Sequence, residues 1–181
     1  MFLNQSSAVM ETYKIREFQL KDQESIFKIW AMNQDLATGF AFIADTDADI
    51  EQEFYKNYFS KPAPIFHVVE DIASQEILGW SSVLPFIHNP IVTRFIGEAS
   101  IYLDQLYFDG DIGSALMQHT FKFAEQTEVR HIYGWIRKEN SAMISLAEEF
   151  CGKNLAEIPA SLDGKLDGYF LYFYNVPQIR K

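Results

Sequence analysis

Cysteine is almost absent from this chain of 181 residues, in which Cys151 stands alone. A single cysteine excludes an internal disulfide and any metal site built from several thiolates. No apolar run approaches the roughly 20 residues that a helix needs to cross a bilayer. Residues 1–12 have no basic stretch followed by an apolar core, so they do not resemble a secretory signal. From these absences we expect a cytoplasmic protein.

Positive charge is also scarce, since 15 Lys and Arg stand against 25 Asp and Glu and give a net charge of −10. Nucleic acids and anionic membrane surfaces are bound by clustered Lys and Arg, so we expect neither as a partner. The acidic balance suits a cationic substrate such as an amine. The four histidines are scattered without the spacing of a metal site, and we expect no metal.

The remaining composition favours one folded domain. Hydrophobic residues make up 48% of the chain and aromatic residues 15%, which allows a sizeable core. The length fits a single domain. We expect this domain to span residues 13–181, after a flexible tail over residues 1–12.

Hydrophobic periodicity predicts elements in the order β-α-α-β-β-β-α-β-α-β, a mixed α/β or α+β arrangement. Asp22 is the predicted N-cap of the first helix, and Asn140 or Ser141 that of the last. The strands are expected at residues 13–18, 65–70, 76–84, 94–103, 130–136 and 168–174. The helices are expected near residues 22–30, over 48–59, from 112, and from 140 or 141.

The stretch YLDQLYFDGDIGSAL, residues 102–116, carries the clearest functional signal. A strand-like run ends here in a turn, and a helix begins at Ile112 and Gly113. A helix N-terminus offers unpaired backbone N–H groups and a partial positive charge, so it can hold a pyrophosphate with few side chains. Gly110 and Gly113 would let the backbone approach such a ligand closely, and Ser114 adds a hydroxyl.

Two carboxylates stand in the same turn. Asp109 and Asp111 lie where the negative charges of such a ligand would sit, and like charges at this range repel. No Lys or Arg occurs between Arg94 and Lys122 to offset them. The turn therefore fits two interpretations, an anion-binding cradle or an acidic turn whose aspartates cap the next helix.

A longer pattern surrounds this turn and follows the order Glu-x-Ser-x-Tyr-Val/Leu-Asp-x-x-Tyr. Its members are Glu98, Ser100, Tyr102, Leu103, Asp104 and Tyr107. The run resembles the phosphinothricin-acetyltransferase-like branch of the GNAT (Gcn5-related) N-acetyltransferases. Shorter matches extend the resemblance to about residues 13–155, at Gly79-Trp80, Pro85-Phe86, Glu139-Asn140 and Leu146.

The resemblance implies a GNAT-like fold, a mixed and mostly antiparallel central sheet flanked by helices. It also implies acetyl-CoA as the co-substrate, bound by the turn and the last helix. The family's turn reads Arg/Gln-x-x-Gly-x-Gly/Ala, whereas this chain has Phe108-x-x-Asp111-x-Gly113. The expected acetyl-CoA-binding residues are Leu103, Phe108, Asp109, Gly110, Asp111, Ile112, Gly113, Ser114 and Asn140.

Glu98 is the candidate catalytic base. Acetyl transfer to an amine needs a neutral nucleophile, so some group must accept a proton from the ammonium. In related acetyltransferases the glutamate that matches Glu98 is assigned this role, and partial burial would raise its pKa. From the residues alone, this carboxylate could instead be solvated or paired with Arg94.

Three further side chains have two interpretations each. Ser100 and Tyr102 share the expected strand face of Glu98 and could bind the substrate, although a strand tyrosine could equally be core packing. Asn140 could hold the pantetheine arm, as its family counterpart does, and also cap its helix. Ala147 stands where many relatives carry a Tyr or His that protonates the leaving thiolate.

We predict an N-acetyltransferase that moves acetyl from acetyl-CoA to a primary amine of a small molecule by direct attack. The alternative is a catalytically degenerate GNAT-fold binding or assembly module without turnover, which the acidic turn and Ala147 favour. A measurement of CoA affinity distinguishes the enzyme from the module without turnover. Acceptor specificity is expected in loops at residues 35–46, 85–93 and 152–168.

A homodimer is also predicted. The last strand, GYFLYFY, is aromatic and uncharged, and we expect it to form an uncovered sheet edge that must be paired or buried. Relatives in this branch commonly pair through their C-terminal strands, so the resemblance implies a two-fold dimer there.

Overall fold

The computed structural model describes residues 12–33, 47–60, 63–86, 92–108, 111–160 and 168–177. The predictions about the N-terminal tail, about Asp109 and Gly110, and about the loop at 35–46 lie outside these ranges. Among the described helices, none is both long and apolar enough to cross a membrane.

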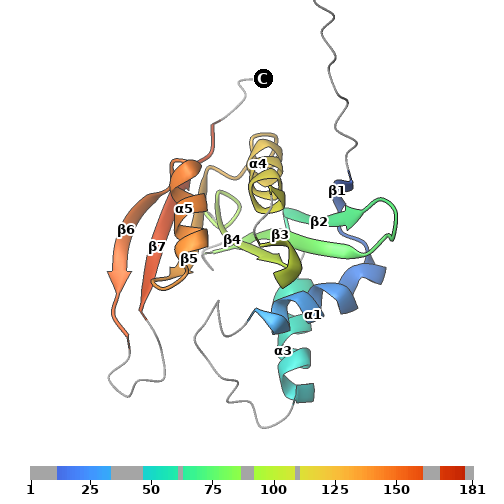
Figure 1. Ribbon diagram of the computed structural model, residues 1–181. Coiled ribbons are helices and arrows are strands. Elements are labelled where there is room, and N and C mark those ends of the chain that lie inside the picture. Colours follow the sequence, from blue (N-terminus) through green and yellow to red (C-terminus); the bar gives the residue numbers. More distant parts are fainter. Residues whose placement is uncertain are drawn as a thin grey trace, which may run out of the picture.

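Seven strands form one sheet in the order β1-β2-β3-β4-β5-β7-β6 (Figure 1). All neighbouring strands pair antiparallel except β4 and β5, which are parallel. The predicted mixed and mostly antiparallel sheet is therefore confirmed. The strands are β1 (Tyr13–Glu17), β2 (Ile65–Asp71), β3 (Ile77–Pro85), β4 (Ile96–Leu103), β5 (His131–Arg137), β6 (Lys153–Ile158) and β7 (Tyr169–Asn175).

Helices cover both faces of this sheet. In Figure 1, α1 and α3 lie together below β2 and β3, whereas α4 stands above β3 and β4, and α5 lies over β5 and β7. The helices are α1 (Gln23–Met32), α3 (Asp47–Phe59), α4 (Ile112–Ala124) and α5 (Ser141–Glu149), with short 3-10 turns η1 (Leu20–Asp22) and η2 (Gln105–Tyr107).

Strand alternation divides the core between these two helix layers. On β2, Val68 packs with α1 and α3, whereas Val69 packs under α4. On β4, Tyr102 belongs with the α1 and α3 layer, whereas Ala99 packs with α5 and β7. Residues of even number on β4 therefore face α1 and α3, as the period of two requires. Glu98 lies on that face.

Asp22 stands at the start of α1, but its carboxylate does not cap the helix. It instead accepts hydrogen bonds from Arg16 at 2.7 and 2.9 Å and from the backbone N–H of Gln19 at 2.8 Å. Arg16 also donates to Glu70 at 2.6 Å. The predicted N-cap position is confirmed, but the carboxylate makes no capping hydrogen bond because it has a charge-assisted partner on β1.

The C-terminal sheet differs from the prediction. Residues 153–158 were expected within a loop, but they form the edge strand β6, and β7 lies between β5 and β6. Every residue of β6 is exposed, so its sequence has no apolar alternation to reveal it. Tyr172 and Tyr174 on β7 are buried. The interpretation of the last strand as an uncovered edge is wrong, and the homodimer stays a prediction without that argument.

Candidate active site

The sheet opens between its two parallel strands. β4 and β5 are joined by three residue pairs, of which the last links Glu98 with Tyr133. Beyond that pair β4 runs on to Leu103 along β3, and β5 runs on to Arg137 along β7. The two strands therefore diverge, and backbone groups that a closed sheet would pair face the gap between them.

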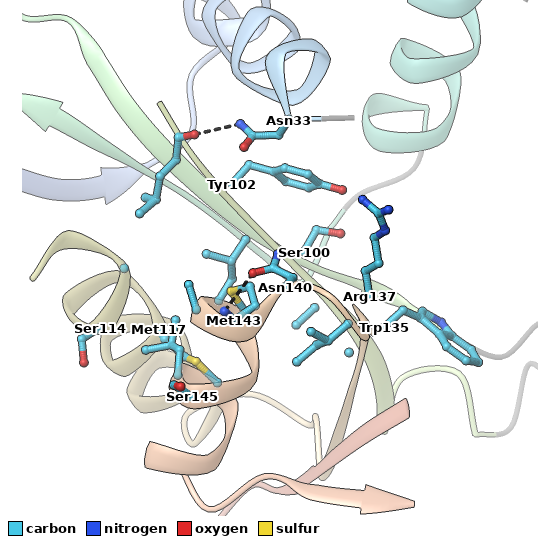
Figure 2. Close-up of a pocket in the computed structure, with 18 of the residues that line it drawn as sticks. Asn33, Ser100, Tyr102, Ser114, Met117, Trp135, Arg137, Asn140, Met143 and Ser145 are labelled. Atoms are coloured by element: carbon cyan, nitrogen blue, oxygen red, sulfur yellow. Dashed lines mark hydrogen bonds between the residues drawn. The ribbon is translucent and has the colours of Figure 1, made fainter. Parts of the chain in front are cut away.

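A cavity of about 850 Å³ fills this gap and reaches both faces of the sheet. On one face it lies under α4 and α5, and on the other it reaches Asn33 at the end of α1 and Tyr58 on α3. Figure 2 shows side chains from both helix layers converging on it. Its size is that of a small-molecule site.

Glu98 lies at the point where the strands part and lines the cavity. Burial raises the pKa of its carboxyl group above the ordinary value, because water no longer solvates the charged form well. The suggested ion pair with Arg94 is not formed, since Arg94 lies 3.9 Å from Glu128 instead. The carboxylate is thus held inside the cavity with a raised proton affinity, which suits a proton acceptor.

Ser100 and Tyr102 continue along β4 on the face of Glu98, as the alternation predicted. The Ser100 hydroxyl lies 3.3 Å from the hydroxyl of Tyr58. Burial raises the pKa of Tyr102 well above its ordinary value, and Tyr58 and Glu98 add to the effect. The Tyr102 ring packs 4.8 Å from Trp80. Tyr102 therefore packs in the core while it also lines the cavity, and its role in substrate binding stays a prediction.

Backbone geometry for an anion is present where α4 begins. Ile112 and Gly113 form the first turn, and Gly113 lines the cavity. A β-carbon on Gly113 would lie 3.4 Å from Leu103 and 3.7 Å from Leu146, so the helix packs closely on β4 and α5 at this point. The first N–H groups of α4 have no partner within the helix and are available to a ligand.

The side chains near the start of α4 are acidic or neutral. Asp111 is exposed at the N-cap position and makes no capping hydrogen bond, so the interpretation of this aspartate as a cap is wrong. The Ser114 hydroxyl donates to Glu149 at 3.0 Å. Phe108 is 39% exposed and lines the cavity. The backbone N–H groups at the start of α4 therefore suit the phosphates of acetyl-CoA, whereas the carboxylate of Asp111 repels them.

Next to α5, the cavity is lined by an amide at the start of the helix and by Glu149 at its end. Asn140 supplies the amide, and its side-chain oxygen accepts a hydrogen bond from the backbone N–H of Met143 at 3.0 Å. Asn140 is thus the predicted N-cap of α5. On β5, Gly134 has no described atom within 4 Å of the place where a β-carbon would lie. This open space between β5 and α5 suits a narrow, uncharged chain.

Ala147 is fully buried in α5 and presents no group to the cavity. The ring of Tyr174 lies near Ala147, and both border Gly152. A β-carbon built on Gly152 would lie 2.6 Å from the Tyr174 ring and 2.7 Å from the carbonyl oxygen of Ala147. Tyr174 itself lines the cavity, and burial raises the pKa of its hydroxyl above the ordinary value.

The other polar candidates lie away from the cavity. His67 is 1% exposed and packs edge-on against His119 at 4.6 Å and against Phe123 at 4.9 Å. Within the described ranges, no group of three or more His, Cys, Asp or Glu side chains could hold a metal ion. Cys151 is exposed and follows α5.

The cavity residues that the sequence analysis missed include Asn33, Tyr58, Trp135 and Arg137. Asn33 donates hydrogen bonds to the carbonyl groups of Ile29 and Leu103 and so ties α1 to the end of β4. Tyr58 lies in the helix predicted over residues 48–59, and the strand predicted over 130–136 placed Trp135 in the sheet. The sequence alone gave no signal that these strands would part.

Comparison with known proteins identifies the arrangement. The profile of the acetyltransferase (GNAT) family matches residues 28–152, which is more than half of the chain. The chain belongs to the GNAT family. No curated protein sequence gives a significant match.

Solved GNAT structures share the fold over nearly the whole chain. An N-acetyltransferase from Staphylococcus aureus Mu50 gives a TM-score of 0.73 at 21% identity and covers 91% of this chain and 99% of its own. A GCN5-related N-acetyltransferase from Kribbella flavida gives 0.74 at 16% identity, with 91% and 98% covered. A phosphinothricin acetyltransferase from Sinorhizobium meliloti, solved with acetyl-CoA, gives 0.70 at 19% identity, with 91% and 89% covered. The predicted GNAT fold is confirmed.

Proposed function

We propose that this GNAT protein transfers acetyl from acetyl-CoA to a primary amine of a small molecule. The observation that carries the proposal is the position of Glu98, a half-buried carboxylate where β4 and β5 part. The same cavity extends to the N-termini of α4 and α5. A proton acceptor and a backbone anion site thus share one space, as acyl transfer from an anionic thioester requires.

Each half of the cavity has a distinct role in this proposal. The first N–H groups of α4 would hold the pyrophosphate, and Asn140 with the open space at Gly134 would hold the pantetheine arm. On the other face, Ser100 and Tyr102 would orient the acceptor. The gap in the sheet lets the two substrates meet without an acyl-enzyme.

Glu98 would act as the general base. The amine nitrogen forms a bond with the thioester carbonyl carbon, the carbon–sulfur bond breaks, and the ammonium proton passes to the carboxylate. The thiolate leaves and takes up a proton in turn. The raised pKa makes the carboxylate of Glu98 a better proton acceptor than an exposed carboxylate.

The second candidate is a GNAT-fold binding or assembly module without turnover. Two observations favour it: Asp111 is exposed at the phosphate end, and Ala147 has no acid to offer the leaving thiolate. The thiolate of CoA leaves readily, so loss of that acid should lower the rate rather than abolish the reaction. The enzyme therefore remains our first proposal. We also propose a cytoplasmic location.

Titration calorimetry with acetyl-CoA, together with release of free CoA thiol in the presence of primary amines, tests the proposal. We expect binding that is weaker than is usual in the family, and turnover of an amine. Absence of binding up to about millimolar ligand at low salt would leave only the non-catalytic module.

The Glu98→Gln variant tests the role of the base. It should lower kcat by about a hundredfold or more and leave acetyl-CoA affinity unchanged, because general-base catalysis typically contributes that much. Part of the rate should return at high pH, where the free amine needs no base. Glu128→Gln removes an exposed carboxylate in the segment before β5 and is the matched control. A Glu98→Gln rate near that of the wild type at neutral pH would remove Glu98 from the mechanism.

A further inference from the structure

The acceptor face of β5 carries three large side chains in a row. Glu98 and Tyr133 are partners in the parallel register, so their side chains lie on the same face of the sheet. Trp135 and Arg137 follow Tyr133 at a period of two and share that face. Ile136 points the other way, into the core beneath the helices. The first of the three therefore stands beside the proposed base.

Aromatic rings form a wall next to Glu98. Phe86 stacks on Tyr133 with centroids 4.9 Å apart at 18°, and Trp135 lies 6.4 Å from Phe86. Tyr133 is supported from β7 by Phe173 at 5.3 Å. Trp135 lines the cavity and keeps 39% of its surface exposed. An exposed indole in a cavity wall offers a flat surface to a planar ligand.

Arg137 stands at the far end of this wall. It is the one basic side chain among the described residues that line the cavity. Figure 2 shows its guanidinium pointing toward the hydroxyl groups of Ser100 and Tyr102. Glu139, which is 59% exposed, approaches its Nε at 3.2 Å. A guanidinium offers five donors in a fork that matches a carboxylate, so an anionic group can bind beside Glu139.

The base lies beside Tyr133, and the indole ring and the guanidinium follow along β5, so a ligand that contacts all three must carry its matching groups in the same order. Successive residues on one face of a strand are about 7 Å apart, so the three side chains follow one another along β5 in the order Tyr133, Trp135 and Arg137. We propose that the acceptor carries its primary amine, a flat aromatic body and a carboxylate in that sequence. The amine lies at Glu98, the ring against Trp135 and the carboxylate at Arg137. This inference rests on the proposed acetyltransferase function.

Four primary amines test the inference in the assay of CoA thiol release. The probe is 4-(aminomethyl)benzoate, benzylamine lacks its carboxylate, 6-aminohexanoate lacks its ring, and propylamine lacks both. We expect kcat/KM for the probe to exceed that for benzylamine by about 10-fold or more, because a charge-assisted hydrogen bond contributes about that factor. The advantage over 6-aminohexanoate should be about 3- to 10-fold. Equal values for all four amines would overturn the inference while the proposed function stands.

Two variants assign the preferences to residues. Arg137→Gln should remove the preference for the probe over benzylamine, and Arg137→Lys should restore part of it. Trp135→Leu should remove the preference for the probe over 6-aminohexanoate. Thermal melting confirms that each variant is folded. A variant that slows all four amines by the same factor would contradict the assigned contact.

A binding measurement separates this inference from the proposed function. The anion 4-methylbenzoate has the ring and the carboxylate but no amine, so calorimetry reports binding without turnover. We expect it to bind the wild type about 10-fold more tightly than Arg137→Gln. If it does so while none of the amines is acetylated, the ligand class stands and the acetyltransferase function fails. Equal binding to both proteins overturns the ligand class.

Discussion

Removal of the Asp111 carboxylate should tighten acetyl-CoA binding. Asp111 is exposed at the N-cap position of α4, where the first N–H groups of that helix are proposed to hold the pyrophosphate. Two unit charges about 6 Å apart interact by about 0.7 kcal/mol in water, and the pyrophosphate carries two negative charges. Because exposed charges are screened, we take about 1 kcal/mol at low salt and about half of that at physiological ionic strength.

These energies predict a roughly five-fold lower Kd for Asp111→Asn at low salt and a roughly two-fold lower Kd at 0.15 M salt. Titration calorimetry with acetyl-CoA at several salt concentrations measures both values. Asp111→Gly removes the side chain as well as the charge. It should therefore tighten binding at least as much as Asp111→Asn if close approach of the backbone also matters.

Glu125→Gln is the matched control, since it removes a negative charge just beyond the other end of α4. The 13 residues of that helix separate the two sites by about 20 Å, more than two screening lengths at 0.15 M salt. An unchanged or weaker affinity in both Asp111 variants would refute the reasoning. It would mean that the phosphates do not lie at the start of α4.

Two predictions concern stability. Burial, with a smaller effect of His119, lowers the pKa of His67 from 6.5 to about 4, so only the unfolded chain takes up this proton between those values. Stability should therefore be full above pH 6.5 and fall by at most about 3 kcal/mol as the pH drops to 4. Urea unfolding from pH 7.5 to 4.5 should show a shallower fall in His67→Gln, and parallel curves for the two proteins would contradict this. Tyr172→Lys should lower the unfolding free energy by about 3 kcal/mol or more, because Tyr172 is 3% exposed in the core; loss of a dimer with an unchanged melting temperature would instead place this residue at an interface.

Local pattern predicted much of the fold. The alternation on β4 placed Glu98, Ser100 and Tyr102 on one face, and the structure confirms that assignment. The start of α4 at Ile112 was also predicted from the turn before it. These features depend on neighbours in the sequence, so a single sequence contains their signal.

Features that depend on distant segments were not predicted. Tyr58 contacts Ser100 across 42 residues of sequence, and nothing in the sequence of α3 shows that this ring lies at a cavity. Arg137 reaches the acceptor face because β5 pairs with β7 after it has left β4. Sequence periodicity reports which side of a strand is buried, but it does not report where two strands separate.

In the acetyl-CoA half of the cavity, different residues determine the shape of the site and its charge. Its shape depends on the backbone: Gly113 packs on Leu103 and Leu146, and Asn140 caps α5, so core contacts hold both helix starts in place. Phe108 and Asp111 depart from the family's turn sequence, but both side chains are exposed. These departures therefore leave the packing of the two helix starts unchanged. Salt should therefore distinguish the two proposed functions. If the backbone anion site at the start of α4 is intact and only the Asp111 charge opposes binding, Asp111→Asn should raise the affinity for acetyl-CoA. This gain in affinity should become smaller as salt is added. If the protein is instead a module without turnover, the site should bind acetyl-CoA poorly at every salt concentration, with or without the Asp111 carboxylate.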